Sequence, residues 1–276
     1  MRHALPFVLV LLLAGCWPGG DARDPDLVPP TRADGDEVVL PLTFPDGTTA
    51  ELAYPAELEL AELGVFPYSS GRLQGKSPTA GRADAVARDF WIRRGDVDDI
   101  LELRNDGEPP ALLAEYTGSD GQLVGFWDFG AEETRQLSFQ FGGWTVLVYD
   151  YVGAAAMTDA ERASWAASFV GRETADGFLI LDALGPLRLA AAGEHAGPQL
   201  TFSESEPRRE ILLYPGPCAP HEDQDRLVEG RRVQWSGEFA DWCLSDLLRI
   251  HAGGEAEFIG AVIRDLSARS VVLATS

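Results

Sequence analysis

The sequence predicts an α+β fold that is mainly antiparallel β-sheet and carries two main helices. Three observations predict it: short runs of alternating apolar residues, turn residues between neighbouring runs, and two segments with apolar residues at helical spacing. The chain has 276 residues, of which 45% are hydrophobic. It is therefore long enough to bury a sizeable core, as one large domain or two smaller ones.

The globular part begins with a predicted β-hairpin. Apolar and other residues alternate over 38–44 and again over 50–54, and Pro45-Asp46-Gly47 supplies a turn between the two runs. Pro55 then opens a short segment, residues 56–63, that is expected to form two helical turns and to stop at Gly64.

The middle of the chain is predicted to be rich in strands. Turn sequences at 118–121 and 142–143 separate neighbouring apolar runs, so residues 111–152 are interpreted as an antiparallel meander. Leu137, Phe139 and Phe141 share one face of a strand and are expected in the core. The expected strands are 89–93, 101–104, 111–117, 122–129, 135–141 and 144–152.

Two longer helices are predicted in the second half of the chain. Thr158 and Glu161 have the spacing of a capping box, and the helix that they start is expected to end at Gly171. The other helix covers 255–266, where apolar residues recur at helical spacing. Strands are expected around these helices at 178–181, 187–190, 199–202, 211–214, 232–235, 247–251 and 271–274.

The segments 144–181 and 247–273 follow the same predicted order of strand, turn, helix and strand. Ala160-Glu161 and Ala256-Glu257 fall at the same place in each. One interpretation is that the fold consists of two related halves, 36–190 and 191–276, with a boundary within 185–198. The other is chance similarity, because no residue-level identity requires the alignment.

The charge of the chain excludes one class of partner. The chain has 44 acidic and 22 basic side chains, a formal charge of −22 and a pI near 4.4. Nucleic acid is bound through Lys and Arg that displace counterions from phosphate, so we expect no nucleic-acid partner.

The N-terminus predicts export. A basic start precedes an apolar run, residues 4–13, which is typical of a secretory signal peptide and too short for a membrane span of about 20 residues. The run ends in Leu13-Ala14-Gly15-Cys16, which resembles the lipobox of bacterial lipoproteins. The resemblance implies that residues 1–15 are removed and that the thiol of Cys16 takes a diacylglyceryl group.

The same resemblance implies a place for the protein in the cell. Membrane lipid, attached through Cys16, would hold it on the extracytoplasmic face of the bacterial cell membrane. The alternative is a secreted protein with a chance cysteine at the junction. Residues 16–35 contain Pro, Gly and Asp and few apolar residues, so the stretch after the lipidated cysteine is expected to be a disordered tether.

Cys218 and Cys243 remain as an even pair in a chain that is predicted to be exported. A disulfide between them is expected, since extracytoplasmic compartments permit disulfides. The alternatives are two separate buried thiols or a metal site, and a metal site is disfavoured because His221 alone does not complete a tetrahedral ligand set.

Motifs for nucleotide or covalent chemistry do not fit. Gly75-Lys76-Ser77 resembles the end of a phosphate-binding loop, but Ser70 stands where that loop needs glycine and Pro78 follows at once. No Gly-x-Ser-x-Gly segment is present, although a Ser, His and Asp triad assembled from distant segments stays open.

Three further residue groups are expected to have ordinary structural roles. His195, His221 and His251 lack the spacing of metal ligands. Acidic clusters at 96–99 and 221–225 offer oxygen atoms to calcium but do not match its loop pattern. The tryptophans are expected to fill the core rather than to form a carbohydrate platform, and they are Trp91, Trp127, Trp144, Trp165, Trp235 and Trp242.

The sequence therefore predicts no catalytic, cofactor-binding or metal-binding residue. The site residues that it predicts are Cys16 for lipid attachment and Cys218 and Cys243 for the disulfide. The function expected is a non-catalytic, lipid-anchored module that binds an envelope protein, a glycan or a small ligand. The alternative is an anchored hydrolase that acts on cell-wall polymer, since a glycosidase needs only two carboxylates placed by the fold. A third class is a subunit of an envelope complex.

Overall fold

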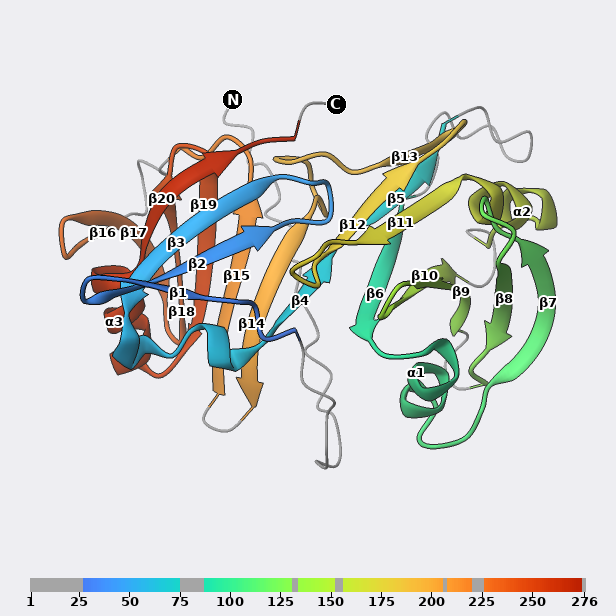
Figure 1. The fold of residues 1–276 in the computed structure, drawn as a ribbon, viewed down its shortest axis with the longest axis horizontal. Helices are drawn as coiled ribbons and strands as arrows, with labels where there is room; N and C mark the ends of the chain where they lie inside the picture. The colour runs from blue at the N-terminus through green and yellow to red at the C-terminus, as the bar shows by residue number, and fades with distance from the viewer. Residues whose placement is uncertain are drawn as a thin grey trace, which may run out of the picture.

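A computed structural model describes residues 27–74, 87–130, 134–151, 156–205, 208–219 and 226–274. The protein is 53% strand, and its sheets are built from antiparallel pairs, which confirms the predicted sheet type. Figure 1 shows two lobes that are joined through β4, β5 and β13. The predicted signal peptide, Cys16 and residues 17–26 lie outside the described residues.

The lobe on the left of Figure 1 contains two sheets. A seven-stranded sheet has the order β16-β17-β18-β19-β15-β14-β4, and a four-stranded sheet has the order β1-β2-β3-β20. Their strands are β1 (Arg32–Asp34), β2 (Glu37–Thr43), β3 (Thr49–Pro55), β4 (Val65–Tyr68), β14 (Gln199–Ser205), β15 (Arg208–Pro215), β16 (Arg226–Val228), β17 (Arg231–Ser236), β18 (Phe239–Ser245), β19 (Leu248–Gly254) and β20 (Ser267–Val272).

The lobe on the right of Figure 1 contains the other seven-stranded sheet and a two-stranded one. The larger sheet has the order β13-β5-β6-β10-β9-β8-β7, and β11 pairs with β12. These strands are β5 (Ser70–Leu73), β6 (Arg88–Arg94), β7 (Ala111–Thr117), β8 (Leu123–Asp128), β9 (Thr134–Phe141), β10 (Trp144–Tyr151), β11 (Phe169–Glu173), β12 (Leu179–Ala183) and β13 (Leu187–Leu189).

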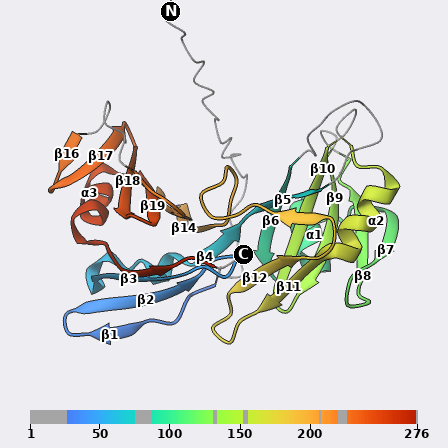
Figure 2. The same cartoon turned by 90° about the horizontal axis from the view of Figure 1, so that it is seen from above.

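Each helix packs its apolar side chains against a sheet. In Figure 2, α3 (Ala256–Asp265) lies between the two sheets of its lobe, and three of its apolar residues, Ile259, Val262 and Ile263, are fully buried. In the other lobe α2 (Asp159–Ser168) begins with the predicted capping box of Thr158 and Glu161. The helix α1 (Val97–Arg104) packs on the outer face of the sheet, and the 3₁₀ turns η1 (Ala56–Leu58) and η2 (Ala61–Leu63) precede β4.

Six strands of each seven-stranded sheet have the same order, whereas the edge strand β13 follows the other strands of its sheet in the chain and the edge strand β4 precedes those of its own. In each sheet a meander, β7 to β10 or β16 to β19, leads to a helix and then to a strand in the smaller sheet. The chain crosses between the lobes twice, after β4 and after β13: β4 pairs with β14 in one lobe, and the next strand, β5, pairs with β13 in the other. Residues 32–68 therefore lie in the lobe of β14 to β20, and the lobes do not coincide with the predicted halves 36–190 and 191–276. β20 pairs with β3, so the described N-terminal and C-terminal strands lie in one lobe.

One hydrophobic cluster runs through both lobes. Phe139 and Phe141 stack with their ring centroids 6.0 Å apart, and Phe169 packs edge-on against each, which confirms the predicted core face of β9. A smaller cluster of Ile100, Leu101, Phe129 and Leu147 lies beneath α1. This main hydrophobic core therefore joins the two lobes.

Several predicted elements are confirmed. The first hairpin is β2 and β3, the meander is β7 to β10, and strands occur at the predicted places around α2 and α3.

Four predictions are wrong. The helix that begins after Thr158 ends at Ser168 rather than at Gly171, because Phe169–Glu173 forms β11 and pairs with β12. Residues 101–104 are not a strand but the last half of α1, whose first turn holds Asp98 and Asp99 and whose last turn holds Arg104, the charges that the helix dipole favours. Residues 56–63 form two separate 3₁₀ turns, because Glu59 adopts a left-handed conformation between them. The predicted tether is too long at its C-terminal end, since Leu27 is buried against Val65 and residues 32–34 form β1.

Candidate ligand-binding site

A pocket opens on the outer face of the seven-stranded sheet formed by β16–β19, β15, β14 and β4. Its volume is about 430 Å³, within the range of about 300–1,000 Å³ that small-molecule sites occupy. Strand residues form its floor, and two loops form its walls. The lining residues are Gly193, Glu194, His195, Gly197, Pro198, Gln199, Tyr214, Pro215, Gly216, Pro217, Asp241 and Arg249.

The polar floor follows from strand register. Tyr214 pairs with Arg249, Arg249 pairs with Cys243, and Gln199 pairs with Tyr68. Leu200 pairs with Leu213, so Gln199 lies across from Tyr214. These residues form one row across β18, β19, β15, β14 and β4. Side chains alternate between faces along a strand, and their neighbours Leu200, Leu213, Leu248 and Ile250 are buried on the core side.

A carboxylate and an imidazole are paired at one end of this floor. Nδ1 of His251 lies 3.0 Å from Oδ1 of Asp241, and the imidazole stacks on the ring of Phe239 with centroids 5.2 Å apart. Burial opposes a charge on His251, but the hydrogen bond and charge of Asp241, with Glu210 adding to them, outweigh it and raise the pKa of the imidazole. The contact fixes the orientation of both side chains, and it is charge-assisted when the imidazole is protonated.

Tyr214 contributes a neutral hydroxyl to the pocket. Burial raises the pKa of this phenol, and the charges of Asp241 and Glu210 raise it further against the opposing effect of Arg249. The hydroxyl therefore stays protonated at physiological pH and both donates and accepts hydrogen bonds.

The walls are two loops that cross at glycines. The backbone N–H of Gly193 donates to the carbonyl of Pro215 at 2.9 Å. Gly216 has φ +126°, and a Cβ there would lie 2.5 Å from the Gly193 nitrogen, so only glycine permits this crossing. The carboxylate of Glu194 accepts from Arg188 at 2.7 Å and from the Ala191 N–H at 2.9 Å. The wall that contains His195 is thus held by its own hydrogen bonds.

The disulfide fixes the second wall. The structure joins Cys218 to Cys243, as predicted, with a Cα to Cα distance of 5.7 Å. Cys218 directly follows the wall residues Pro215, Gly216 and Pro217, and Cys243 lies in the floor row beside Arg249. The backbone N–H of Cys218 also donates to the carbonyl of Asp246. The bridge therefore connects this wall of the pocket to its floor.

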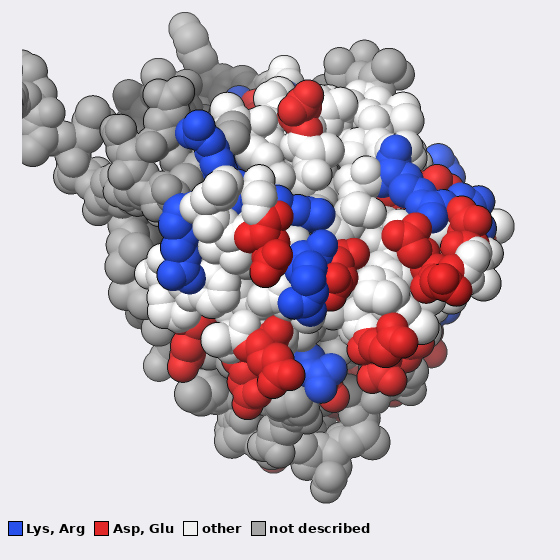
Figure 3. All heavy atoms as spheres, turned by 90° about the vertical axis from the view of Figure 1, so that its left-hand side faces the viewer, with Lys and Arg blue, Asp and Glu red and all other residues white. Residues whose placement is uncertain are grey.

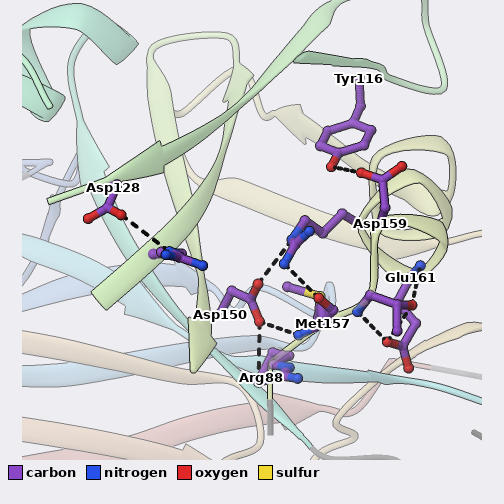
Figure 4. Close-up of polar contacts among 10 residues, drawn as sticks. Arg88, Tyr116, Asp128, Asp150, Met157, Asp159 and Glu161 are labelled. Atoms are coloured by element: carbon purple, nitrogen blue, oxygen red, sulfur yellow. Dashed lines mark hydrogen bonds and ion pairs between the residues drawn. The ribbon is translucent and has the colours of Figure 1, made fainter. Parts of the chain in front are cut away.

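A second charged cluster lies in the other lobe but is closed to ligands. Asp150, with 1% of its side chain exposed, lies 3.0 Å from Nε of Arg162 and 3.8 Å from Arg88, and it accepts from the Met157 N–H at 2.6 Å. Figure 4 shows these groups converging on one carboxylate between β10 and the start of α2. Its oxygens are already bonded within the chain, so the cluster holds α2 on the sheet.

The structure places the histidines and acidic clusters of the sequence differently. His195 lines the pocket and His251 adjoins it, whereas His221 and the cluster 221–225 lie outside the described residues, as do Lys76 and Ser77. Asp96 is the N-cap residue of α1. Within the described part of the chain, no three His, Cys, Asp or Glu side chains are grouped to hold a metal ion.

The tryptophans are core residues, as predicted. Trp144, Trp165 and Trp242 are buried, and the half-buried ones pack against apolar clusters. Trp91 and Trp127 lie against the cluster under α1, and Trp235 lies against the main core.

Figure 3 shows the face on the left-hand side of Figure 1, and the surface charges on this face are mixed. Red acidic and blue basic side chains are interspersed on this end of the left-hand lobe. Ion pairs of this lobe include Arg264 with Asp265 and Arg269 with Asp34 and Glu37. Among the described helices, none combines the length and the apolar content needed to cross a membrane.

The fold and the pocket define a two-lobed antiparallel β protein with a polar pocket, among its described residues, at the outer face of a sheet. Comparison with protein-family models, with curated proteins and with solved structures finds no match to the chain. Its function must therefore be argued from its own residues.

Proposed function

We propose that this protein is a lipid-anchored module on the extracytoplasmic face of the bacterial cell membrane and that it binds a small polar ligand in the pocket above β14, β15 and β19. The observation that carries the binding role is the convergence of Gln199, Tyr214 and Arg249 on one preformed cavity. A largely preformed concavity with a few convergent polar groups is typical of a ligand site.

Binding accounts for the pocket better than catalysis does. The contacts of His251 in the described residues are with Asp241 and Phe239, and neither offers the hydroxyl or thiol nucleophile that a triad requires. A glycosidase needs one carboxyl that stays protonated. The hydrogen bond from Arg188 instead lowers the pKa of Glu194 at the pocket wall.

The anchor in this proposal rests on the apolar N-terminal run and the lipobox-like Leu13-Ala14-Gly15-Cys16. Cys16→Ala should release the protein from membranes or leave an unprocessed precursor, and unchanged membrane fractionation would contradict the anchor. Leu27, the first described residue, is buried against Val65. Eleven Cα–Cα steps join Cys16 to Leu27, so the lipidated cysteine lies at most about 40 Å from Leu27.

The pocket is tested by a binding screen on residues 27–274. Small polar molecules of neutral, anionic and cationic classes are added to ¹⁵N-labelled protein, and the amide signals of Gly193 and Gly216 report on the two walls. We expect at least one class to shift both signals and Arg249→Ala to remove the effect. Arg172→Ala, at an exposed arginine of β11, serves as the control. A screen in which no class shifts these signals contradicts the proposed role.

We propose further that the two lobes are related, with α2 and α3 as their equivalent main helices, and that the relation covers residues 70–189 and 199–272 rather than the predicted halves 36–190 and 191–276. Support comes from the equal strand order of the large sheets and from the equal place of the two helices, each between the last meander strand and the smaller sheet. In this interpretation α1 is an addition to one half, and it covers the outer face that stays open as the pocket in the other.

A further inference from the structure

We propose that the ligand of the pocket is an uncharged saccharide. The inference rests on the proposed function and names the chemical class that this site would take. Three features of the described residues support it: balanced charge, mixed donors and acceptors, and a floor row that continues from the pocket to a second tyrosine.

The charges in and directly behind the lining compensate one another. Glu194 is paired with Arg188 at 2.7 Å, and Asp241 is paired with His251 at 3.0 Å. Arg249 also lines the pocket, and it too interacts within the chain. A small anion or cation that entered would meet charges of both signs, whereas an uncharged polar molecule loses no charge solvation on binding. The site therefore favours a neutral ligand.

The hydrogen-bonding groups suit a ring of hydroxyls. Arg249 only donates, the ionised Asp241 only accepts, and the amide of Gln199 and the hydroxyl of Tyr214 each do both. Neighbouring hydroxyls on a sugar also donate and accept, so this mixture can satisfy them in pairs. A site selective for carboxylate or phosphate would instead gather donors.

The floor row gives the ligand a direction. Tyr214, Gln199 and Tyr68 occupy β15, β14 and β4 at one level. Adjacent strands lie about 4.8 Å apart, so the two tyrosines are separated by roughly 10 Å along the sheet. Aromatic side chains combine an apolar ring with a polar end, which suits the mixed faces of a sugar. The geometry points to a short oligosaccharide lying across the strands from Arg249 towards Tyr68.

The test is a titration of the whole mature chain, residues 16–276 with Cys16→Ala to keep it free of lipid, with defined probes. Glucose, N-acetylglucosamine and cellobiose represent neutral saccharides, and succinate and putrescine represent small charged ligands. The amide signals of Gly193 and Gly216 and the imidazole signals of His251 report on the pocket. We expect a saccharide to shift these signals and the charged probes to leave them unchanged.

Matched variants locate the two ends of the site. Tyr214→Phe removes one hydroxyl and should weaken both mono- and disaccharide about tenfold. Tyr68→Ala should weaken the disaccharide about tenfold and leave the monosaccharide unchanged. Tyr149→Phe, on β10 of the other lobe, is the control, and thermal melting checks that each variant folds.

The outcomes separate this inference from the proposed function. Shifts with succinate or putrescine but with no saccharide would overturn the saccharide class and leave the pocket's binding role intact. Saccharide shifts confined to residues outside the pocket would overturn the site. Unchanged signals with every probe, in this titration and in the wider screen, would overturn both.

Discussion

His251 links the pocket to pH. In the folded protein Asp241 and Glu210 favour the charged imidazole against the effect of burial, so the pKa of His251 lies above its usual value of 6.5. Protonation of His251 is more favourable in the folded than in the unfolded protein, so it stabilises the fold. This stabilisation is fully present below about pH 6.5, the unfolded pKa, and is lost as the pH rises through the raised folded-state pKa.

We predict that NMR titration of His251 gives a midpoint above 6.5 in the native protein. Asp241→Asn should move the midpoint below 6.5, because the burial stays while the main favourable charge is removed. Asp246→Asn, at an exposed aspartate between β18 and β19, should leave it unchanged. An unaltered midpoint in Asp241→Asn would show that the pair does not set the charge of His251.

Asp150 is the residue on which the attachment of α2 depends most. Its carboxylate lies between Arg162 and Arg88, whose side chains are 14% and 6% exposed. We predict that Asp150→Ala lowers the free energy of unfolding by about 3–5 kcal/mol, because it leaves buried positive charge without its partner.

The measurement is urea denaturation, with Asp159→Ala as the control. Asp159 is exposed in the first turn of α2 and accepts from the hydroxyl of Tyr116 at 2.6 Å. Asp159→Ala should lower the free energy of unfolding by about 1 kcal/mol or less. Equal losses in the two variants would contradict the role given to the buried carboxylate.

At the scale of elements, the disulfide connects the second wall of the pocket to its floor. The bridge spans 25 residues, and closing a loop of that size stabilises a fold by about 3.5 kcal/mol in the chain-entropy account. The double variant Cys218→Ser and Cys243→Ser should lose that amount and should bind the pocket's ligand more weakly, since Pro217 is no longer fixed to β18.

Urea denaturation and ligand titration check both parts of this prediction. A reducing agent should lower the stability of the native protein to that of the double variant and should leave the double variant unchanged. A double variant as stable as the native protein would show that other contacts hold this wall.

Element prediction succeeded where local chemistry decides the structure. The capping box of Thr158 and Glu161 and the turn at 118–121 act within a few residues, and both are found as predicted. It failed at α1, because Ile100, Leu101 and Leu103 also fit a short strand. The charges at the ends of α1 and its packing on Leu147 and Phe129 favour the helix over the strand.

The pocket could not be predicted in this way. Tyr214, Asp241 and Arg249 each occur in an alternating strand, where a polar residue indicates only an outward-facing side chain. They meet because β15, β18 and β19 pair in one register. Two features of the sequence pointed towards the pocket. The polar residues alternate with apolar ones along their strands, and the predicted disulfide lies beside them.

At the scale of the whole molecule, the two predicted sequence halves depend on each other. β4 pairs with β14 and β3 with β20, so strands from residues 27–190 and 191–274 share one lobe, and a single hydrophobic cluster includes both lobes. These pairings join residues far apart in sequence, which is why local patterns indicated two halves but not that β1 to β4 lie with the second one.

We predict that fragments 27–190 and 191–274 do not fold when expressed separately and form a stable one-to-one complex when expressed together. Each fragment alone would expose an unpaired sheet edge and part of the shared core. Circular dichroism of each fragment and size-exclusion chromatography of the pair check this. A single fragment with cooperative unfolding would contradict the account of a shared core.

The central claim is that the pocket above β14, β15 and β19 binds a saccharide. The most direct measurement is a crystal structure of residues 27–274 grown with the saccharide that binds best in titration. We predict that its ring contacts Tyr214 and Arg249 and that a second unit extends towards Tyr68. A saccharide bound on any other surface, with the pocket empty, would contradict the claim.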